Sequence, residues 1–317
     1  MAKSVLSDPH FHDEEAAYAF IEARVWPNGP VCPHCGSVER ISKMQGSSTR
    51  IGTYKCYACR KPFTVKIGTI FESSHVKLHL WLQAIFLMAS SKKGISSNQL
   101  HRTLGVTLKT AWFMSHRIRE AMRRDDLDPM GGPGGIVEVD ETYYGKQADP
   151  QPSEHRKGRP YLKRGVGPAS KRPILALVER KGEVRSFHVA QANKTNVREL
   201  VQANLSHEAR LFTDESPLYR DWTDGFAEHS RVKHSAGEYV RGEVHTNTVE
   251  NVFSVFKRGM KGTYQHCAEK HLHRYLAEFD FRYNARTALG VCDVDRAERA
   301  LRGVSGKRLT YETIGQR

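Results

Sequence analysis

Three carboxylates stand on separate predicted elements of this chain. Asp140 lies within a β-rich apolar run, and Asp214 ends a second run of the same kind. Glu250 lies in residues 245–261, where apolar side chains recur at spacings of three, four, seven and eleven, the pattern of one amphipathic helix. Two strand-borne carboxylates joined by a third from a helix are typical of a divalent-metal site, and hard oxygen ligands suit Mg²⁺.

The predicted helix carries further polar candidates. Thirty-five residues separate Asp214 from Glu250, and Lys257 follows Glu250 by seven, two helical turns along the same face. Asn247 shares that face one turn before Glu250, so geometry alone leaves open which of the two is the third ligand. A carboxylate neutralises the charge of Mg²⁺ and an amide does not, which favours Glu250. Asn247 is better suited to capping or to holding a carboxylate or phosphate, although Thr246 is the first choice of N-cap.

Four cysteines form two Cys-x-x-Cys pairs, Cys32 with Cys35 and Cys56 with Cys59, with 20 residues between the pairs. Two such knuckles provide the closed tetrahedral shell of structural Zn²⁺, so we expect a zinc ribbon. The N-terminus has no apolar signal-peptide core, and no run approaches the roughly 18 apolar residues that span a membrane. We therefore expect a cytoplasmic protein without a membrane partner, in which paired cysteines bind metal rather than form disulfides.

The formal net charge of +14 favours a polyanionic partner. Residues 94–122 predict two helices with a turn at Gly105, similar to a helix-turn-helix whose second helix reads the major groove. In that second helix the predicted DNA contacts are Lys109, Arg117 and Arg119. A loop at 151–172 contains Gly and Pro and carries seven basic residues that we expect to contact the DNA backbone. These residues are Arg156, Lys157, Arg159, Lys163, Arg164, Lys171 and Arg172.

An acidic stretch followed by Gly and Pro at 125–135 marks a domain boundary. Beyond it, a strand, a hairpin at 173–190, a helix and the strand that ends at Asp214 follow the order of an RNase H-like domain. We expect an α/β protein whose catalytic domain is a mixed sheet flanked by helices. The predicted parts are an N-terminal helix with the zinc ribbon (1–73), a helix-turn-helix region (74–128), the catalytic domain (136–290) and a C-terminal tail (291–317).

Several ordered motifs resemble the zinc-ribbon insertion-sequence transposases of the ISXO type, a bacterial group of DDE transposases. The resemblance implies an RNase H-like fold in which Asp140, Asp214 and Glu250 bind catalytic Mg²⁺ or Mn²⁺, with Lys257 at a phosphate near the cut. This family is often described with an Asn as its third catalytic residue, so Asn247 stays a candidate beside Glu250. The matching motifs are WPNGPVCPHCGS (26–37), VEVDETYYG (137–145), FTDES (212–216), HTNTVENVFSVFKRGMKGTY (245–264) and RYLAEFDFRYNAR (274–286).

The function implied is that of a DNA transposase. It would recognise terminal inverted repeats in double-stranded DNA, cut their 3′ ends and join them to target DNA, as a homo-oligomer on DNA and associated with the nucleoid when bound. One alternative is an RNase H-fold nuclease that cuts without joining, and the predicted DNA-reading N-terminal region argues against it. The other is a zinc-ribbon and helix-turn-helix regulator with an inactive catalytic domain, and the intact carboxylate set argues against that.

Overall fold

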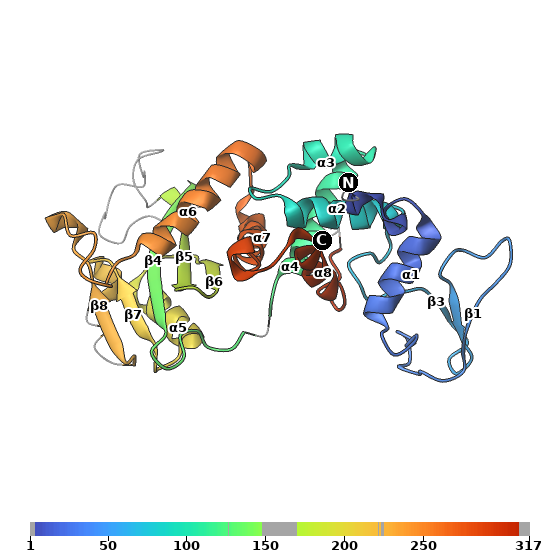
Figure 1. Cartoon of the computed structure of the whole chain (residues 1–317), viewed down its shortest axis with the longest axis horizontal. Helices are drawn as coiled ribbons and strands as arrows, with labels where there is room; N and C mark the ends of the chain where they lie inside the picture. The colour runs from blue at the N-terminus through green and yellow to red at the C-terminus, as the bar shows by residue number, and fades with distance from the viewer. Residues whose placement is uncertain (1–3, 126, 148–169, 221, 223–224, 311–317) are drawn as a thin grey trace, which may run out of the picture. The chain divides into compact units, whose positions relative to one another are not determined.

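The computed structural model describes the chain except for residues 1–3, 126, 148–169, 221, 223–224 and 311–317 (Figure 1). The chain divides into two compact units, the first made of residues 1–123 and 287–317 and the second of residues 124–286. Among the described residues, no helix is long and apolar enough to cross a membrane.

The first unit begins with helix α1 (Glu14–Val25), whose N-terminus is capped by the Asp13 side chain. A small antiparallel sheet follows, built from β1 (Ile41–Lys43), β2 (Tyr54–Cys56) and β3 (Pro62–Phe63). The rings of Trp26, Tyr54 and Phe63 pack together next to the cysteines and give this short sheet its own apolar core.

Helices form the rest of the first unit: α2 (Leu78–Ser90), α3 (Ser97–Leu104), α4 (Leu108–Met122) and α8 (Asp293–Arg302). Gly105 joins α3 to α4 in the left-handed region (φ +65°), which favours glycine. The side chains of Ser96 and Thr107 cap the N-termini of α3 and α4. The segment expected to be a tail contains α8, which packs on α2 and α4, so the chain's C-terminal residues complete the core of its N-terminal unit.

The second unit is built on a five-stranded sheet in the order β6-β5-β4-β7-β8. Neighbours among β6, β5 and β4 are antiparallel, whereas β4, β7 and β8 run parallel, so the sheet is mixed as expected for an RNase H-like domain. The strands are β4 (Ile136–Lys146), β5 (Lys171–Glu179), β6 (Val184–His188), β7 (Arg210–Thr213) and β8 (Glu228–Arg231).

Helices cover both faces of this sheet (Figure 1). Side chains alternate along each strand, so Val137 and Val139 of β4 pack on the side of α5 (Lys194–Asn204). The opposite face packs on α6 (Asn247–Gly259) and α7 (Leu272–Asn284). This alternation assigns Glu138 and Asp140 to the α6 face, where their partners across the ladder, Val178 and Ala176, also lie. The α/β fold class predicted from the sequence is confirmed.

Helix α7 pairs with the edge strand β6 through its side chains. The Asn284 side chain accepts from the backbone N–H of Val184 (2.7 Å) and donates to its carbonyl oxygen (2.9 Å). The Asp280 carboxylate accepts from the backbone N–H and from the hydroxyl of Ser186, both at 2.7 Å. These contacts satisfy backbone groups that an open sheet edge would offer to another strand.

Asp280 makes stability depend on pH. Burial disfavours its charged form and raises its pKa from 3.8 to about 7, although the hydrogen bonds from Ser186 favour the charge. The native state therefore keeps a proton that the unfolded chain releases, so the stabilisation is complete below about pH 4 and declines as the pH rises through about 7. Asp280→Asn cannot ionise, and its stability should vary less with pH over this window, by roughly 1–4 kcal/mol.

Urea unfolding between pH 4.5 and 8 checks this expectation. Glu199→Gln, which removes an exposed carboxylate from α5, serves as the control and should keep the wild-type pH dependence. Parallel stability curves for wild type and Asp280→Asn would contradict the role assigned to Asp280.

Candidate active site

Asp140 lies within β4, on the face that packs against α6. Its Oδ1 accepts a hydrogen bond from the backbone N–H of Glu141 (2.8 Å). Burial raises its pKa well above the usual range, and the negative charges of Glu141, Asp214 and Glu250 raise it further. A bound proton or a nearby cation would therefore stabilise the Asp140 carboxylate.

Asp214 directly follows β7, the parallel neighbour of β4. The register that pairs Glu138 with Phe212 carries Asp140 and Asp214 to equivalent positions, each two residues further on. Asp214 Oδ1 accepts from the backbone N–H of Ser216 (2.9 Å), an Asx-turn that fixes the carboxylate where the strand ends. Burial raises the pKa of Asp214 as well; His234 opposes the shift, and Glu250 adds to it.

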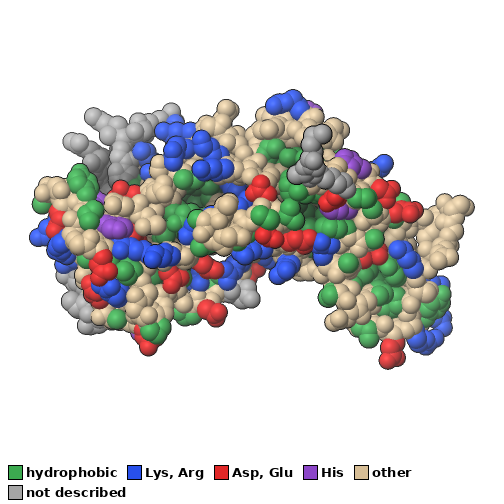
Figure 2. Space-filling model, viewed as in Figure 1, with side chains coloured by type: hydrophobic (Ala, Val, Ile, Leu, Met, Phe, Trp, Pro, Cys, Tyr) green, Lys and Arg blue, Asp and Glu red, His purple; other side chains and the backbone are tan. Residues whose placement is uncertain are grey.

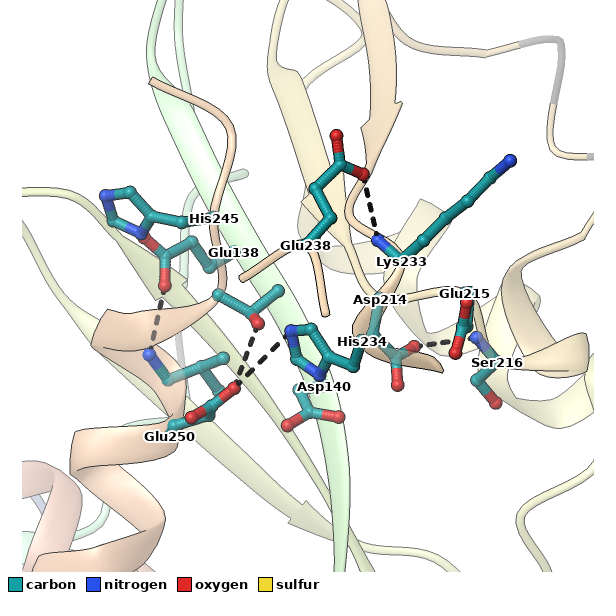
Figure 3. Close-up of polar contacts among 12 residues, drawn as sticks. Glu138, Asp140, Asp214, Glu215, Ser216, Lys233, His234, Glu238, His245 and Glu250 are labelled. Atoms are coloured by element: carbon teal, nitrogen blue, oxygen red, sulfur yellow. Dashed lines mark hydrogen bonds and ion pairs between the residues drawn. The ribbon is translucent and has the colours of Figure 1, made fainter. Parts of the chain in front are cut away.

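Glu250 lies in the first turn of α6 and faces the two aspartates (Figure 3). Its Oε1 accepts from the hydroxyl of Thr246 (3.2 Å) and lies 3.9 Å from Nε2 of His234. Its side chain is 47% exposed, so it is the most accessible of the three carboxylates. Asn247, the first residue of the same helix, is also exposed.

The carboxylate oxygens of Asp140, Asp214 and Glu250 do not approach one another as closely as the ligand atoms of one metal ion do. Among the described residues, only the four cysteines bring three or more such ligand atoms within 4.8 Å of one another. No described residue donates to the second oxygen of Asp140 or Asp214, which leaves each aspartate one oxygen for a ligand. Three hard oxygen donors around a common space, with two raised pKa values, fit a divalent cation.

Lys257 lies two turns beyond Glu250, in the last turn of α6. Burial lowers the pKa of its ammonium group, and the negative charge of Asp140 partly opposes that shift. The lysine is therefore electrostatically coupled to the carboxylate cluster, although it comes from the far end of the helix.

Sequence reasoning missed two acidic residues of β4 that support this cluster. Glu141 accepts from the hydroxyls of Tyr219 (2.5 Å) and Ser216 (3.3 Å), so it fastens β4 to the segment that follows Asp214. Glu138 accepts hydrogen bonds from the first turn of α6. The sequence signal that was available is their position beside Asp140 in an otherwise apolar strand.

Two histidines to which the sequence analysis gave no role differ in their surroundings. His229 packs within the fold, with its ring nitrogens near the Thr213 hydroxyl (3.0 Å) and the Trp222 carbonyl oxygen (3.1 Å). His234 lies between Asp214 and Glu250 (Figure 3). Its ring stacks on Tyr239. Only His234 therefore belongs to the candidate site.

The predicted DNA-contacting arginines of α4 need correction. Arg117 is buried and donates to the carbonyl oxygens of Ile70 and Glu72, both at 2.7 Å. Arg119 is 1% exposed and donates to the Ser115 hydroxyl (3.1 Å). Neither guanidinium group faces solvent: Arg117 fastens α4 to the segment at 70–72, and Arg119 is enclosed against its own helix. Lys109 in the first turn is exposed.

Arg172 needs the same correction. It is buried and donates to the carbonyl oxygens of Lys146 (2.6 Å) and Cys267 (2.7 Å). Lys171, next to it at the start of β5, is exposed. The other five basic residues of the predicted loop lie outside the described residues: Arg156, Lys157, Arg159, Lys163 and Arg164.

The cysteine cluster has the geometry of a metal shell. The sulfurs of Cys32 and Cys59 lie 3.7 Å apart, as do those of Cys35 and Cys56, and all four lie within 4.8 Å of one another. A tetrahedron with Zn–S bonds of about 2.3 Å has edges of about 3.8 Å. The backbone N–H groups of Cys59 and Ala58 lower the pKa of Cys56 to about 7, which favours the thiolate that a metal requires. The predicted zinc ribbon is confirmed as a fold, and its sulfur geometry supports Zn²⁺.

Metal analysis of the purified protein should give about one zinc per chain, because four thiolates complete one closed shell. Cys56→Ser/Cys59→Ser should lose the metal, since it removes half of the ligands. Cys292→Ser, at an exposed cysteine that caps α8, should retain it. Zinc retained at the wild-type level in the double variant would sink this assignment.

Comparison with known proteins matches two segments of the chain to family models. A family model described as an ISXO2-like transposase domain matches residues 133–284, and one described as a transposase zinc-ribbon domain matches residues 12–62. A Halobacterium salinarum protein, named as an uncharacterized protein in transposable element ISH50, is 30% identical over 280 residues, covering 86% of this chain and 91% of that protein.

Among solved structures, one match is a simian T-cell lymphotropic virus intasome in complex with the PP2A regulatory subunit B56 gamma. It is 14% identical and covers 57% of this chain and 63% of that one. Its TM-score of 0.29 is too low to carry an argument about this chain.

Proposed function

Because the chain belongs to the ISXO2-like family of insertion-sequence transposases, we propose that it binds the ends of its element and catalyses metal-dependent DNA cleavage and strand transfer. This proposal is carried by the arrangement of Asp140, Asp214 and Glu250, which come from two parallel strands and a helix and face a common space. Negative charge develops on the attacking and leaving oxygens during phosphoryl transfer at DNA, and divalent cations held by such an anionic site would stabilise it.

Asp140, Asp214 and Glu250 would hold Mg²⁺ or Mn²⁺ in this site. Such ions, when bound, supply Lewis-acid stabilisation and favour an ionised water or 3′-hydroxyl nucleophile. The backbone N–H groups of Glu141 and Ser216 orient the two aspartates, and the Thr246 hydroxyl orients Glu250. The chain's own residues thus orient the carboxylates of an anionic site.

Basic side chains would hold the DNA around this site. Figure 2 shows Lys and Arg side chains gathered over the C-terminal part of α6, where Lys257, Arg258 and Lys261 lie. Lys257 is suited to a phosphate near the cut, because an ammonium group is a compact point charge. Lys109 is suited to contact DNA from the second helix of the helix-turn-helix.

These assignments imply a separate role for each part of the chain. The zinc ribbon and residues 74–128 would recognise terminal inverted repeats, and residues 136–290 would cut and join. Joining two ends to one target requires more than one catalytic site, so we propose a homo-oligomer assembled on DNA. A strand-transfer assay with end-containing DNA separates this function from a nuclease that cuts without joining and from an inactive regulator.

Glu250→Gln should reduce strand transfer in Mg²⁺ to background while DNA binding survives, because an amide cannot neutralise the cation's charge. Asn247→Ala should retain measurable activity, reduced about 10- to 100-fold if Asn247 only holds a ligand in place. Both residues lie in the first turn of α6 and are exposed, so the two variants are matched in position. Normal cutting by Glu250→Gln together with a dead Asn247→Ala would make Asn247 the third catalytic residue.

Neutralising Lys163 and Arg164 to Gln should weaken binding to all DNA sequences, because backbone contacts carry no sequence information. The slope of log affinity against log salt should fall by about one to two units. Lys181→Gln/Lys270→Gln removes the same charge from exposed sites outside the loop and should leave the slope nearly unchanged. A loss confined to end-containing DNA would contradict this role for the loop.

A further inference from the structure

We propose that Glu138 is a positioning residue that caps helix α6 from strand β4 and thereby fixes Glu250 relative to Asp140. It would touch neither DNA nor metal. The proposal rests on the proposed function only for what this fixed geometry serves; the cap itself is a matter of contacts between a strand and a helix.

The Glu138 side chain is fully buried, and its carboxylate points at the N-terminus of α6. Its Oε2 accepts from the backbone N–H groups of Thr248 (2.8 Å) and Val249 (3.1 Å). Its Oε1 accepts from the Thr248 hydroxyl (2.8 Å). First-turn amides have no partner within their own helix, and the helix dipole favours a negative charge at this end. The carboxylate therefore does the work of an N-cap.

The residue at the N-cap position of α6 does not supply this cap. Thr246 makes no side-chain hydrogen bond to a first-turn amide, and its hydroxyl donates to Glu250. The sequence-based choice of Thr246 as N-cap is therefore correct in position and wrong in function. The helix takes its cap from a strand 110 residues earlier in the chain.

Arg180 connects the same carboxylate to the segment that leads into α6. Its Nε donates to Glu138 Oε1 (2.7 Å), and its Nη atoms donate to the carbonyl oxygens of Glu243 (2.7 Å) and His245 (3.1 Å). His245 Nδ1 also lies 3.3 Å from Glu138 Oε1 (Figure 3). One buried charge is thus shared between the last residues before the helix and its first turn, which fixes where the helix begins.

The hydrogen bonds of Glu138 link Asp140 and Glu250, two of the proposed catalytic carboxylates, through few intervening residues. Glu138 precedes Asp140 by two residues on the same face of β4, and Val249 directly precedes Glu250. The partners described for the Glu138 carboxylate are hydrogen-bond donors. The amide NH₂ of a Gln at this position would therefore face other donors and leave at least one of them unpaired. Glu138→Gln should loosen the first turn of α6 while preserving the shape of the side chain.

A simpler reading is that Glu138 and Arg180 are a buried ion pair that only stabilises the unit. Glu278 provides a matched control, because it is equally buried, pairs with Arg282 and accepts from the Tyr264 hydroxyl (2.5 Å). It lies on α7, away from the first turn of α6. Breaking a buried ion pair is strongly destabilising in either place, so only effects on the site separate the two roles.

The experiment compares full-length wild type, Glu138→Gln and Glu278→Gln. Hydrogen exchange of peptides covering 246–252 should accelerate at least tenfold in Glu138→Gln and stay near wild type in Glu278→Gln. In a titration that follows protein stability, Glu138→Gln should need about tenfold more Mn²⁺ for half-saturation. Strand transfer should fall about 10- to 100-fold in Glu138→Gln, with partial recovery at high Mg²⁺. Thr248→Val, an isosteric change that removes one hydrogen bond to Glu138, should shift the same readouts in the same direction by a few fold.

Unchanged exchange at 246–252 in both Glu138→Gln and Thr248→Val would overturn the proposal. So would equal shifts in Mn²⁺ requirement for Glu138→Gln and Glu278→Gln, because that result assigns both to general stability. If Glu138→Gln fails to fold, Thr248→Val decides alone. Absence of strand transfer by wild type would overturn the proposed function, while the exchange data would still decide whether Glu138 holds the helix.

Discussion

Carboxylates gathered in a partly buried site repel one another and lose contact with water. The rest of the fold must therefore offset the unfavourable electrostatic free energy of bringing them together. That cost appears as the raised pKa values of Asp140 and Asp214. Two adjacent parallel strands hold the aspartates at matching heights, and apolar packing on both sheet faces keeps the strands rigid. The third carboxylate comes from a helix, which must be fastened to the same sheet separately.

The parts of this arrangement that depend on local sequence could be predicted. Three features depend only on residues close together in the sequence. They are the apolar period of α6, the Cys-x-x-Cys knuckles and the strand that ends at Asp214. Their order along the chain was sufficient to anticipate a mixed sheet with helices on its faces, because connections between such elements follow few topologies. The fold class and the general position of the three carboxylates were therefore accessible from the sequence.

The parts that depend on distant partners could not be predicted. In a chain with a net charge of +14, the sequence does not distinguish an arginine that contacts a phosphate from one that donates to a backbone carbonyl oxygen. The sequence predicts that Arg117 contacts DNA from a recognition helix and Arg172 from a basic loop, yet both are buried against backbone carbonyl groups. The cap of α6 could not be predicted for the same reason. The local pattern indicates Thr246, whereas the carboxylate that accepts from the first-turn amides lies in β4. Helix α8 likewise finds its partners at the opposite end of the sequence.

The position of α6 and the chemistry of its first turn are separable properties. Glu138 and Arg180 fix where the helix begins, whichever residue in that turn supplies the ligand. The aspartates are held on strands, whereas the Glu250 side chain is 47% exposed and has more freedom to adjust to a cation and to DNA. One helix start presents both Asn247 and Glu250, so the helix position serves whichever of the two residues is the third ligand. Charge favours Glu250, which we propose as the third ligand: two aspartates offset the charge of one divalent cation, but a pair of such cations keeps an excess positive charge without a third carboxylate.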